Sequence, residues 1–193
     1  MLKRALSLLS LSLISLTLSA GCGADDPAVD DGAPSAAAGR AALSTSGQSI
    51  RTPSGTTFIS DPVHHVVYRQ ISFNDPLVII AGASNQPSYV DGAAAASRLN
   101  TPNGLAYDAA QNVLYVADVG NRAVRKIVLG GSRTVTTAVT SAQAVSAGLA
   151  AGFASVSSLG VRGVGVGQSG RLYITDSTNQ VVWMKPANST LRL

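Results

Sequence analysis

The sequence predicts an all-β fold built from repeated groups of four strands. Three segments share one pattern, an aromatic residue, a β-branched residue, a small residue and an aspartate, and they end at Asp61, Asp118 and Asp176. The aspartates are 57 and 58 residues apart. Each is followed by a short turn and a second run rich in β-branched residues, which is typical of a hairpin. A fixed period of this length indicates a repeat architecture.

The middle unit is the best preserved, and it divides into four strands bounded by Gly, Asn and Asp. The expected strands are residues 103–108, 112–117, 122–129 and 133–138. The first and third units provide about three strands each, so the chain has about ten. The three repeats cover about residues 55–82, 102–139 and 161–185. Four strands per unit is the pattern of a β-propeller blade.

The middle unit resembles the NHL repeat. The motifs that carry the resemblance are Pro-Asn-Gly-Leu-Ala-Tyr-Asp at 102–108, Leu-Tyr-Val-Ala-Asp-Val-Gly-Asn-Arg at 114–122 and Val-Arg-Lys-Ile at 124–127. Residues 80–82 and 90–92 are similar to the linker that bacterial NHL proteins place between blades. The resemblance implies an incomplete β-propeller of NHL type with two to three four-stranded blades.

About ten strands are too few to close a ring, because propellers usually have 4–8 blades of four strands. Each blade packs against two neighbours, so an open set of blades leaves an apolar face at each end. Three interpretations follow: a fragment of a longer reading frame, self-association of several copies into one ring, or terminal strands that cap the ends. Two or three blades alone are expected to be marginally stable or prone to aggregate.

The repeated aspartates are interpreted as structural turn caps and not as catalysts. An aspartate at the end of a strand accepts hydrogen bonds from the backbone N–H groups that follow it. Asparagines stand three residues after the second and third aspartates. The expected caps are Asp61, Asp118, Asp176, Asn121 and Asn179.

Glycines are expected to serve two purposes in the repeats. Gly120 is expected to supply the positive φ that a tight hairpin requires. Gly163, Gly165 and Gly167 lie in the strand expected nearest the propeller axis, where backbones crowd and side chains must be small.

The N-terminal residues 1–21 resemble a lipoprotein signal peptide. Lys3 and Arg4 precede an uncharged apolar run that is shorter than the roughly 20 residues of a permanent membrane span. Leu-Ser-Ala-Gly-Cys at 18–22 is similar to the bacterial lipobox, in which the cysteine carries diacylglycerol, and Cys22 is the single cysteine of the chain. The resemblance implies a lipid-anchored protein of the bacterial cell envelope. Gly23, where Asp would be a retention signal by analogy with enterobacterial sorting, favours the outer membrane, facing the periplasm or the surface. Ordinary secretion with an incidental cysteine is the alternative.

Residues 22–49 are predicted to form a flexible spacer, and residues 50–193 the propeller segment. The spacer is rich in Ala, Gly, Ser, Asp and Pro and has no apolar period. The chain as a whole carries a net charge of +4. Its densest basic group is Arg122, Arg125 and Lys126, but no aromatic residues alternate with these as single-stranded nucleic acid would require, so we expect no nucleic-acid partner.

Few side chains are available for catalysis or metal binding. The 193 residues include no glutamate, one cysteine and two adjacent histidines, His64 and His65, which point in different directions on a strand or turn. We therefore expect no catalytic residue, no metal and no cofactor.

Two functions remain. The first is an exported, lipid-anchored NHL-repeat module that presents a binding or scaffold surface to an envelope protein, a peptide or a glycan. The alternative is a fragment of a propeller enzyme, of the metal-dependent lyase or lactonase type, whose metal ligands come from blades outside this sequence.

Overall fold

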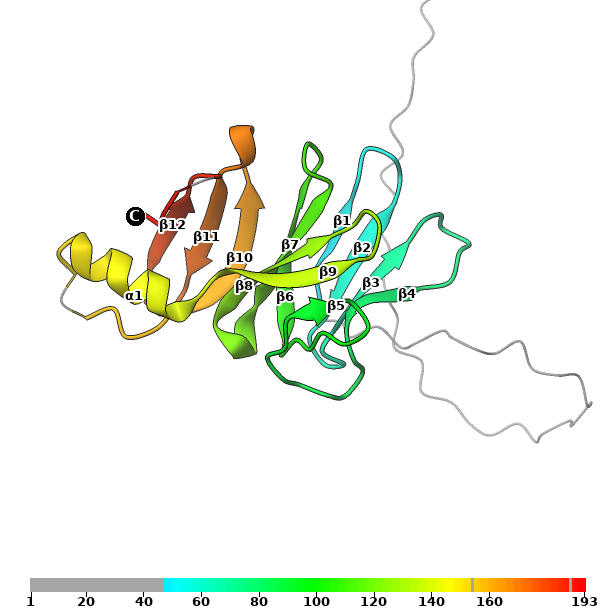
Figure 1. Ribbon diagram of the computed structural model, residues 1–193, viewed down its shortest axis with the longest axis horizontal. Coiled ribbons are helices and arrows are strands. Elements are labelled where there is room, and N and C mark those ends of the chain that lie inside the picture. Colours follow the sequence, from blue (N-terminus) through cyan, green and yellow to red (C-terminus); the bar gives the residue numbers. More distant parts are fainter. Residues whose placement is uncertain (1–46, 154, 188) are drawn as a thin grey trace, which may run out of the picture. The chain divides into compact units, whose positions relative to one another are not determined.

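The computed structural model describes residues 47–153, 155–187 and 189–193; the predicted signal peptide, Cys22 and nearly all of the predicted spacer lie outside these ranges. The described residues form three antiparallel sheets that follow one another along the chain (Figure 1). The all-β prediction with three repeated sheets is confirmed. The described ranges contain twelve strands, where about ten were expected for the chain.

The first and second sheets are meanders in which consecutive strands pair. The first sheet has the order β1(Ser49–Arg51), β2(Thr57–Asp61), β3(Val66–Gln70), β4(Val78–Gly82). The second sheet contains β6(Pro102–Asp108), β7(Val113–Asp118), β8(Ala123–Val128), β9(Thr134–Val139) and, beyond β9, the two-residue strand β5(Gly92–Ala93). The strands that the sequence did not predict are β1 and β5.

The third sheet has three strands in the order β10(Val161–Val166), β11(Leu172–Asp176), β12(Val181–Lys185). A single further bridge flanks β12, because Met184 and Arg192 exchange two backbone hydrogen bonds of 2.6 and 2.7 Å. Two short 3-10 turns, η1(Val119–Asn121) and η2(Gln168–Gly170), follow β7 and β10.

A helix that the sequence analysis did not predict, α1(Ser141–Ala150), connects the second sheet to the third. Thr140 and Gln143 form a capping box at its start: the Thr140 hydroxyl accepts from the Gln143 N–H, and the Gln143 side chain accepts from the Thr140 N–H. The helix buries Ala144 and Gly148. A side chain in place of Gly148 would collide with Val156 and touch Trp183, so the helix lies close to the third sheet.

Two apolar clusters hold the sheets together, one on each side of the second sheet. Along β7, Leu114 and Val116 belong to the cluster shared with the first sheet. Tyr115 and Ala117 belong to the cluster shared with the third sheet. Every residue of β7 is therefore buried, as the alternation of a strand covered on both faces requires.

The leading strands of the second and third sheets approach closely at two glycines. A Cβ on Gly104 of β6 would lie 2.8 Å from the Cα of Gly163 in β10 and 2.9 Å from the Arg162 carbonyl oxygen. Such separations are too short for any side chain, so glycine at this position allows the two backbones to meet. The crowding expected around Gly163 is thus present there, whereas a Cβ on Gly165 would meet no atom within 4 Å.

Candidate functional site

Each of the three repeat aspartates lies buried at the turn that joins the second and third strands of its repeat. The exposed fractions of Asp61, Asp118 and Asp176 are 0%, 0% and 2%. A buried carboxylate must be matched by hydrogen-bond donors or a positive charge. We call each carboxylate with its donors an aspartate node.

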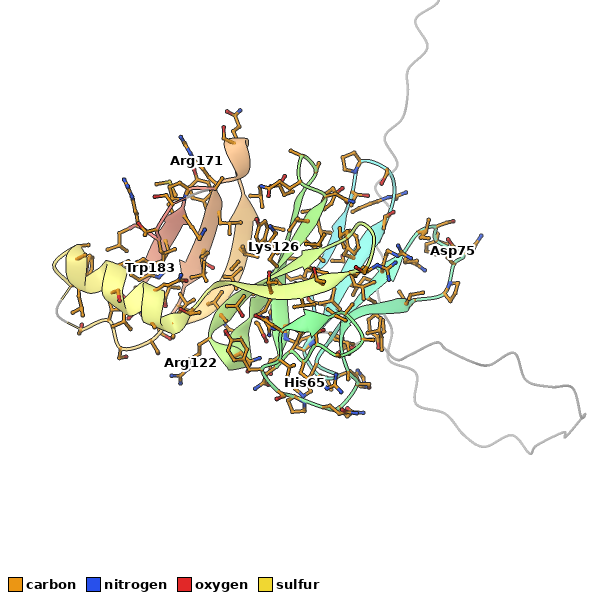
Figure 2. The ribbon with its side chains drawn as sticks, in the orientation of Figure 1. His65, Asp75, Arg122, Lys126, Arg171 and Trp183 are labelled. Carbon is orange, nitrogen blue, oxygen red and sulfur yellow. The ribbon has the colours of Figure 1, made fainter. Side chains whose placement is uncertain are left out.

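In the first and third nodes the carboxylate accepts from the backbone of the turn that follows. Oδ1 of Asp61 accepts from the N–H groups of Val63 and His64 at 3.1 and 3.0 Å. Oδ1 of Asp176 accepts from the N–H groups of Thr178 and Asn179, both at 3.0 Å. The second oxygen of Asp176 receives the indole N–H of Trp183, a buried side chain of β12, at 2.8 Å (Figure 2).

The second node is an ion-pair network centred on Arg125. Asp118 makes no cap to the turn η1; its Oδ2 instead accepts from Arg125 at 2.9 Å. The fully buried guanidinium also donates to Asp91 at 2.5 Å and to the carbonyl oxygens of Val90 and Arg98. Its central carbon lies 4.8 Å from the centroid of the Tyr89 ring. Arg125 therefore organises the linker that leads from the first sheet to the second.

The second and third nodes hold the preceding linker in the same way. The N–H of Asn100 donates to Asp118 at 2.7 Å, and the N–H of Gly160 donates to Asp176 at 3.0 Å. Asn121 then connects Asp118 to the carbonyl oxygen of Ser88. Asn179 likewise connects Asp176 to the carbonyl oxygen of Ser158. Asp118 and Asp176 thus each bind the linker that leads into their own sheet.

The backbone of the turn also repeats, but at a position that the sequence analysis did not select. Four residues after each aspartate, His65, Arg122 and Gln180 have φ of 60°, 52° and 57°. Gly120 does not have a positive φ, so the expectation for it was wrong. A Cβ at this position would collide with the side-chain amide of Asn100, which would have to move to make room.

The two histidines bind different partners. Nδ1 of His64 lies 2.7 Å from Asp61 Oδ2, at the place that asparagine occupies in the other nodes. Nδ1 of His65 accepts from the N–H of Thr101 at 3.0 Å and so connects the first sheet to the linker after it. In the described ranges no three His, Cys, Asp or Glu side chains form a group that could hold a metal ion.

The second and third nodes shift the pKa values of their carboxyl groups in opposite directions. Burial raises the pKa of Asp118 above its ordinary value, and the hydrogen bonds from Asn100, Asn121 and Arg125 offset that effect only in part. Burial also acts to raise the pKa of Asp176, but the hydrogen bonds from Trp183, Asn179 and Gly160 together outweigh it and hold this pKa below its ordinary value of 3.8.

We expect Asp176 to make the chain less stable in acid. Since its pKa is lower in the folded state than in the unfolded chain, its stabilising contribution is complete above the unfolded pKa and is lost as the pH falls through the folded pKa. Urea unfolding of the wild type and of Asp176→Asn at pH 7 and pH 3 measures this contribution. The wild type should lose more free energy of unfolding than the variant between the two pH values; an equal loss would contradict the assignment.

A polar cleft lies between the first and second sheets, at the ends of the strands opposite to the nodes. Its volume is about 170 Å³. The β1–β2 turn contributes three hydroxyl groups, and the second sheet contributes the Tyr107 hydroxyl and the Asn112 amide. The lining residues are Thr52, Ser54, Thr56, Phe58, Arg69, Tyr107, Asn112 and Leu129. The aromatic rings of Phe58 and Tyr107, one from each sheet, have centroids 6.2 Å apart.

Arg69 is the charged group of the cleft. Its guanidinium makes no hydrogen bond or ion pair with any residue that the structure describes, and its Nε is buried. The surrounding hydroxyls are partly engaged with each other: those of Thr52 and Ser54 are 2.9 Å apart, and Tyr107 donates to Asn112 at 3.2 Å. The cleft therefore offers an unneutralised cation beside hydroxyl groups and an aromatic wall. The sequence analysis gave no reason to select Arg69.

The three sheets are similar to solved structures from several bacteria. An auxiliary nutrient binding protein from Bacteroides thetaiotaomicron superposes with a TM-score of 0.53 at 16% identity, over 69% of this chain and 35% of the other. The gluconolactonase XC5397 from Xanthomonas campestris gives 0.50 at 20% identity, over 75% and 44%. A putative phosphatase from B. thetaiotaomicron gives 0.55 at 16% identity, over 76% and 34%. The nutrient binding protein and the gluconolactonase are propeller-type folds.

The described chain is part of a β-propeller. The chain spans less than half the length of each of these structures, and the likeness concerns the fold alone because the identities are low. A nutrient-binding protein and a gluconolactonase share this fold, so the propeller itself is compatible with both a binding role and an enzymatic one.

Sequence comparison gives a shorter match. A segment of 89 residues, 46% of the chain, is 37% identical to the protein SUPPRESSOR OF QUENCHING 1, chloroplastic, from Arabidopsis thaliana, and the match covers 8% of that protein. No protein-family model matches the sequence. In the part of the chain that the structure describes, no helix has both the length and the apolar character needed to cross a bilayer.

Proposed function

We propose that the chain is an NHL-type, lipid-anchored binding module of the bacterial cell envelope that catalyses no reaction. The observation that carries this proposal is the contrast between its carboxylates and Arg69. The three repeat aspartates are buried and accept hydrogen bonds from donors of their own chain, so they stabilise the turns and linkers of the fold. Arg69 is left without a partner among the described residues, in a cleft that is open to a ligand.

Among the three expected ligands, an envelope protein, a peptide and a glycan, the chemistry of the cleft favours an acidic glycan. A guanidinium binds carboxylate groups with two parallel hydrogen bonds, and hydroxyl and amide side chains suit the hydroxyls of a sugar. The volume of about 170 Å³ is below the range of roughly 300–1,000 Å³ usual for drug-sized ligands. We therefore infer that the cleft receives one sugar-acid unit at the end of a longer glycan.

The location of the module rests on its N-terminal sequence. The lipobox-like residues 18–22 support a lipid on Cys22, and Gly23 in place of Asp favours the outer membrane. The similarity to auxiliary nutrient binding proteins is consistent with a binding role at the envelope. Two or more acyl chains would anchor the protein firmly. Mass spectrometry of the membrane-extracted protein tests this directly: an unmodified Cys22 would contradict the anchor.

Substitution of Arg69 tests the binding role. We expect Arg69→Gln to weaken binding of oligogalacturonate about 10–100-fold in isothermal titration calorimetry, since a charge-assisted hydrogen bond is worth roughly 1.5–3 kcal/mol. Arg171→Gln is the matched control. It removes the same charge from an exposed residue at the β10–β11 turn, outside the cleft (Figure 2), and should leave affinity unchanged.

Three outcomes would contradict the proposal. Equal weakening by both variants would show that only net charge matters, and equal affinity for a neutral galactan oligomer would remove the role of the carboxylate. Stoichiometric calcium or zinc in the purified protein would instead favour the alternative, a segment of a metal-dependent propeller enzyme.

A further inference from the structure

Two arginines at the interface between the first and second sheets have no partner for their charge. The Nε atoms of Arg69 and Arg133 are buried, and neither guanidinium makes a hydrogen bond or ion pair with any residue that the structure describes. Arg125 also has a buried Nε, but its other two nitrogens bind Asp118 and Asp91. Since an unpaired buried polar group costs folding free energy, Arg133 needs an explanation as much as Arg69 does.

Arg133 stands directly before β9, and its side chain points toward the first sheet. The N–H of Ala94 donates to the Arg133 carbonyl oxygen at 2.9 Å, so the pairing of β5 with β9 continues through this residue. Val135, two residues further on and therefore on the same face, is fully buried in the cluster shared with the first sheet. The register that pairs Ile127 with Val135 sets Leu129 opposite Arg133. Since Leu129 lines the cleft, Arg133 lies at its border.

Arg69 has the matching position on the first sheet. Val67, two residues before it in β3, is buried in the same cluster, so the Arg69 side chain faces the second sheet. Arg69 pairs across the strands with Val78 of β4, which is 43% exposed, and solvent therefore reaches the interface at this point. Because facing sheets stack about 10 Å apart, both arginines can reach one ligand that enters there.

We propose that Arg133 binds the acidic group of a second sugar unit, so that the ligand is a glycan with acidic groups on consecutive units. The inference rests on the proposed function, in which Arg69 binds the terminal sugar acid, and it narrows the class of ligand. Two unpaired cations on facing sheets repel each other, and one carboxylate would neutralise only one of them. A second carboxylate, on the next unit, can form two parallel hydrogen bonds with the other guanidinium. A neutral second unit would leave Arg133 without a partner.

Calorimetric titration with two disaccharides tests the role of Arg133. Digalacturonate carries a carboxylate on each unit, whereas galacturonate linked to a neutral sugar carries only the first. Arg133→Gln should weaken binding of digalacturonate about 10–100-fold, the effect of losing one charge-assisted hydrogen bond, and leave the affinity for the mixed disaccharide unchanged. Arg171→Gln removes the same charge outside the cleft and should change neither affinity.

Arg69→Gln separates this inference from the proposed function. It should weaken binding of both disaccharides, because each carries the carboxylate that Arg69 binds. If it does so while Arg133→Gln leaves the affinity for digalacturonate unchanged, the inference about Arg133 is wrong and the proposed function stands. Equal weakening of both disaccharides by Arg133→Gln would also overturn the inference. If Arg69→Gln weakens neither, the proposed function itself fails.

The fold of the Arg133→Gln variant is checked in the same experiment. Because the Arg133 guanidinium makes no hydrogen bond or ion pair with a described residue, its removal should not lower the melting temperature. Unchanged binding of the mixed disaccharide shows directly that the Arg69 cleft of the variant is intact.

Discussion

Replacing Asp118 with asparagine is expected to lower the free energy of unfolding by about 3–5 kcal/mol, the usual effect of removing one partner of a buried ion pair. Arg125 is fully buried and remains charged in the folded chain, so the substitution leaves it with Asp91 as its one carboxylate partner. The side chain of Asp91 is 47% exposed, so solvent screens its charge and Asp91 alone compensates the buried Arg125 charge only weakly.

The control for this prediction is Asp75→Asn, which removes a carboxylate from the exposed β3–β4 loop (Figure 2) and should change stability by less than about 1 kcal/mol. Urea unfolding at neutral pH measures both variants. Arg125→Gln combined with Asp118→Asn should recover part of the loss, because no uncompensated charge then remains buried. Equal stability of the two single variants would mean that the network does not hold the second sheet.

Replacing Gly82 with alanine is expected to cost about 2–5 kcal/mol. Gly82 ends β4 with φ of +84°, where a side chain costs roughly 1–2 kcal/mol. Its Cβ would also collide with the carbonyl oxygen of His65 and lie 3.1 Å from the Cα of Val66. Both obstacles are backbone atoms where the turn after Asp61 enters β3, so the strand or the turn must move, which adds about 1–3 kcal/mol.

Gly152 provides a control that differs in one respect. Its φ is +86°, nearly equal to that of Gly82, but a Cβ there would meet no atom within 4 Å. Gly152→Ala should therefore show the conformational strain alone, about 1–2 kcal/mol. The difference between the two variants in thermal or urea unfolding isolates the collision at His65. If both variants lose the same free energy of unfolding, the predicted collision between residue 82 and the His65 carbonyl oxygen is contradicted.

The strands of the middle unit could be predicted to within about one residue because their signals are local. Alternating β-branched residues end at Gly, Asn and Asp, and β6 to β9 follow these limits closely. β1 and β5 have only three and two residues and no such run. They are strands because β2 and β9 present free edges to pair with, which is a tertiary effect that the local sequence does not contain.

The sequence at the start of the helix α1 contains a helix N-terminal signal. Thr140 and Gln143 have the spacing of a capping box, and the ten residues that follow Thr140 are rich in alanine, a strong helix former. The segment lies between two strands of the repeat pattern, β9 and β10, and the repeat itself predicts only strands. Reading the capping box together with the composition would have placed a helix there.

The role of Arg125 could not be read from charge clustering. The sequence presents Arg122, Arg125 and Lys126 as one basic group, but the structure separates them: Arg125 is fully buried, while Arg122 is exposed in the turn and Lys126 is partly exposed (Figure 2). Alternation along β8 places Arg125 and Lys126 on opposite faces. Asp118 is 7 residues from Arg125 across the β7–β8 turn, but identifying Asp91 as the second partner requires the pairing of segments 34 residues apart.

The aspartate nodes bear on how such a chain can grow by duplication. Since Asp118 and Asp176 each bind the stretch that precedes their own sheet, the inherited unit is a sheet together with the connection leading into it. A gene duplication that copied four strands alone would keep the donors of the turn but lose the linker N–H that each carboxylate binds, Asn100 for Asp118 and Gly160 for Asp176. One that began in the linker, by Ser88 for the second sheet or Ser158 for the third, would include every linker group that the node binds.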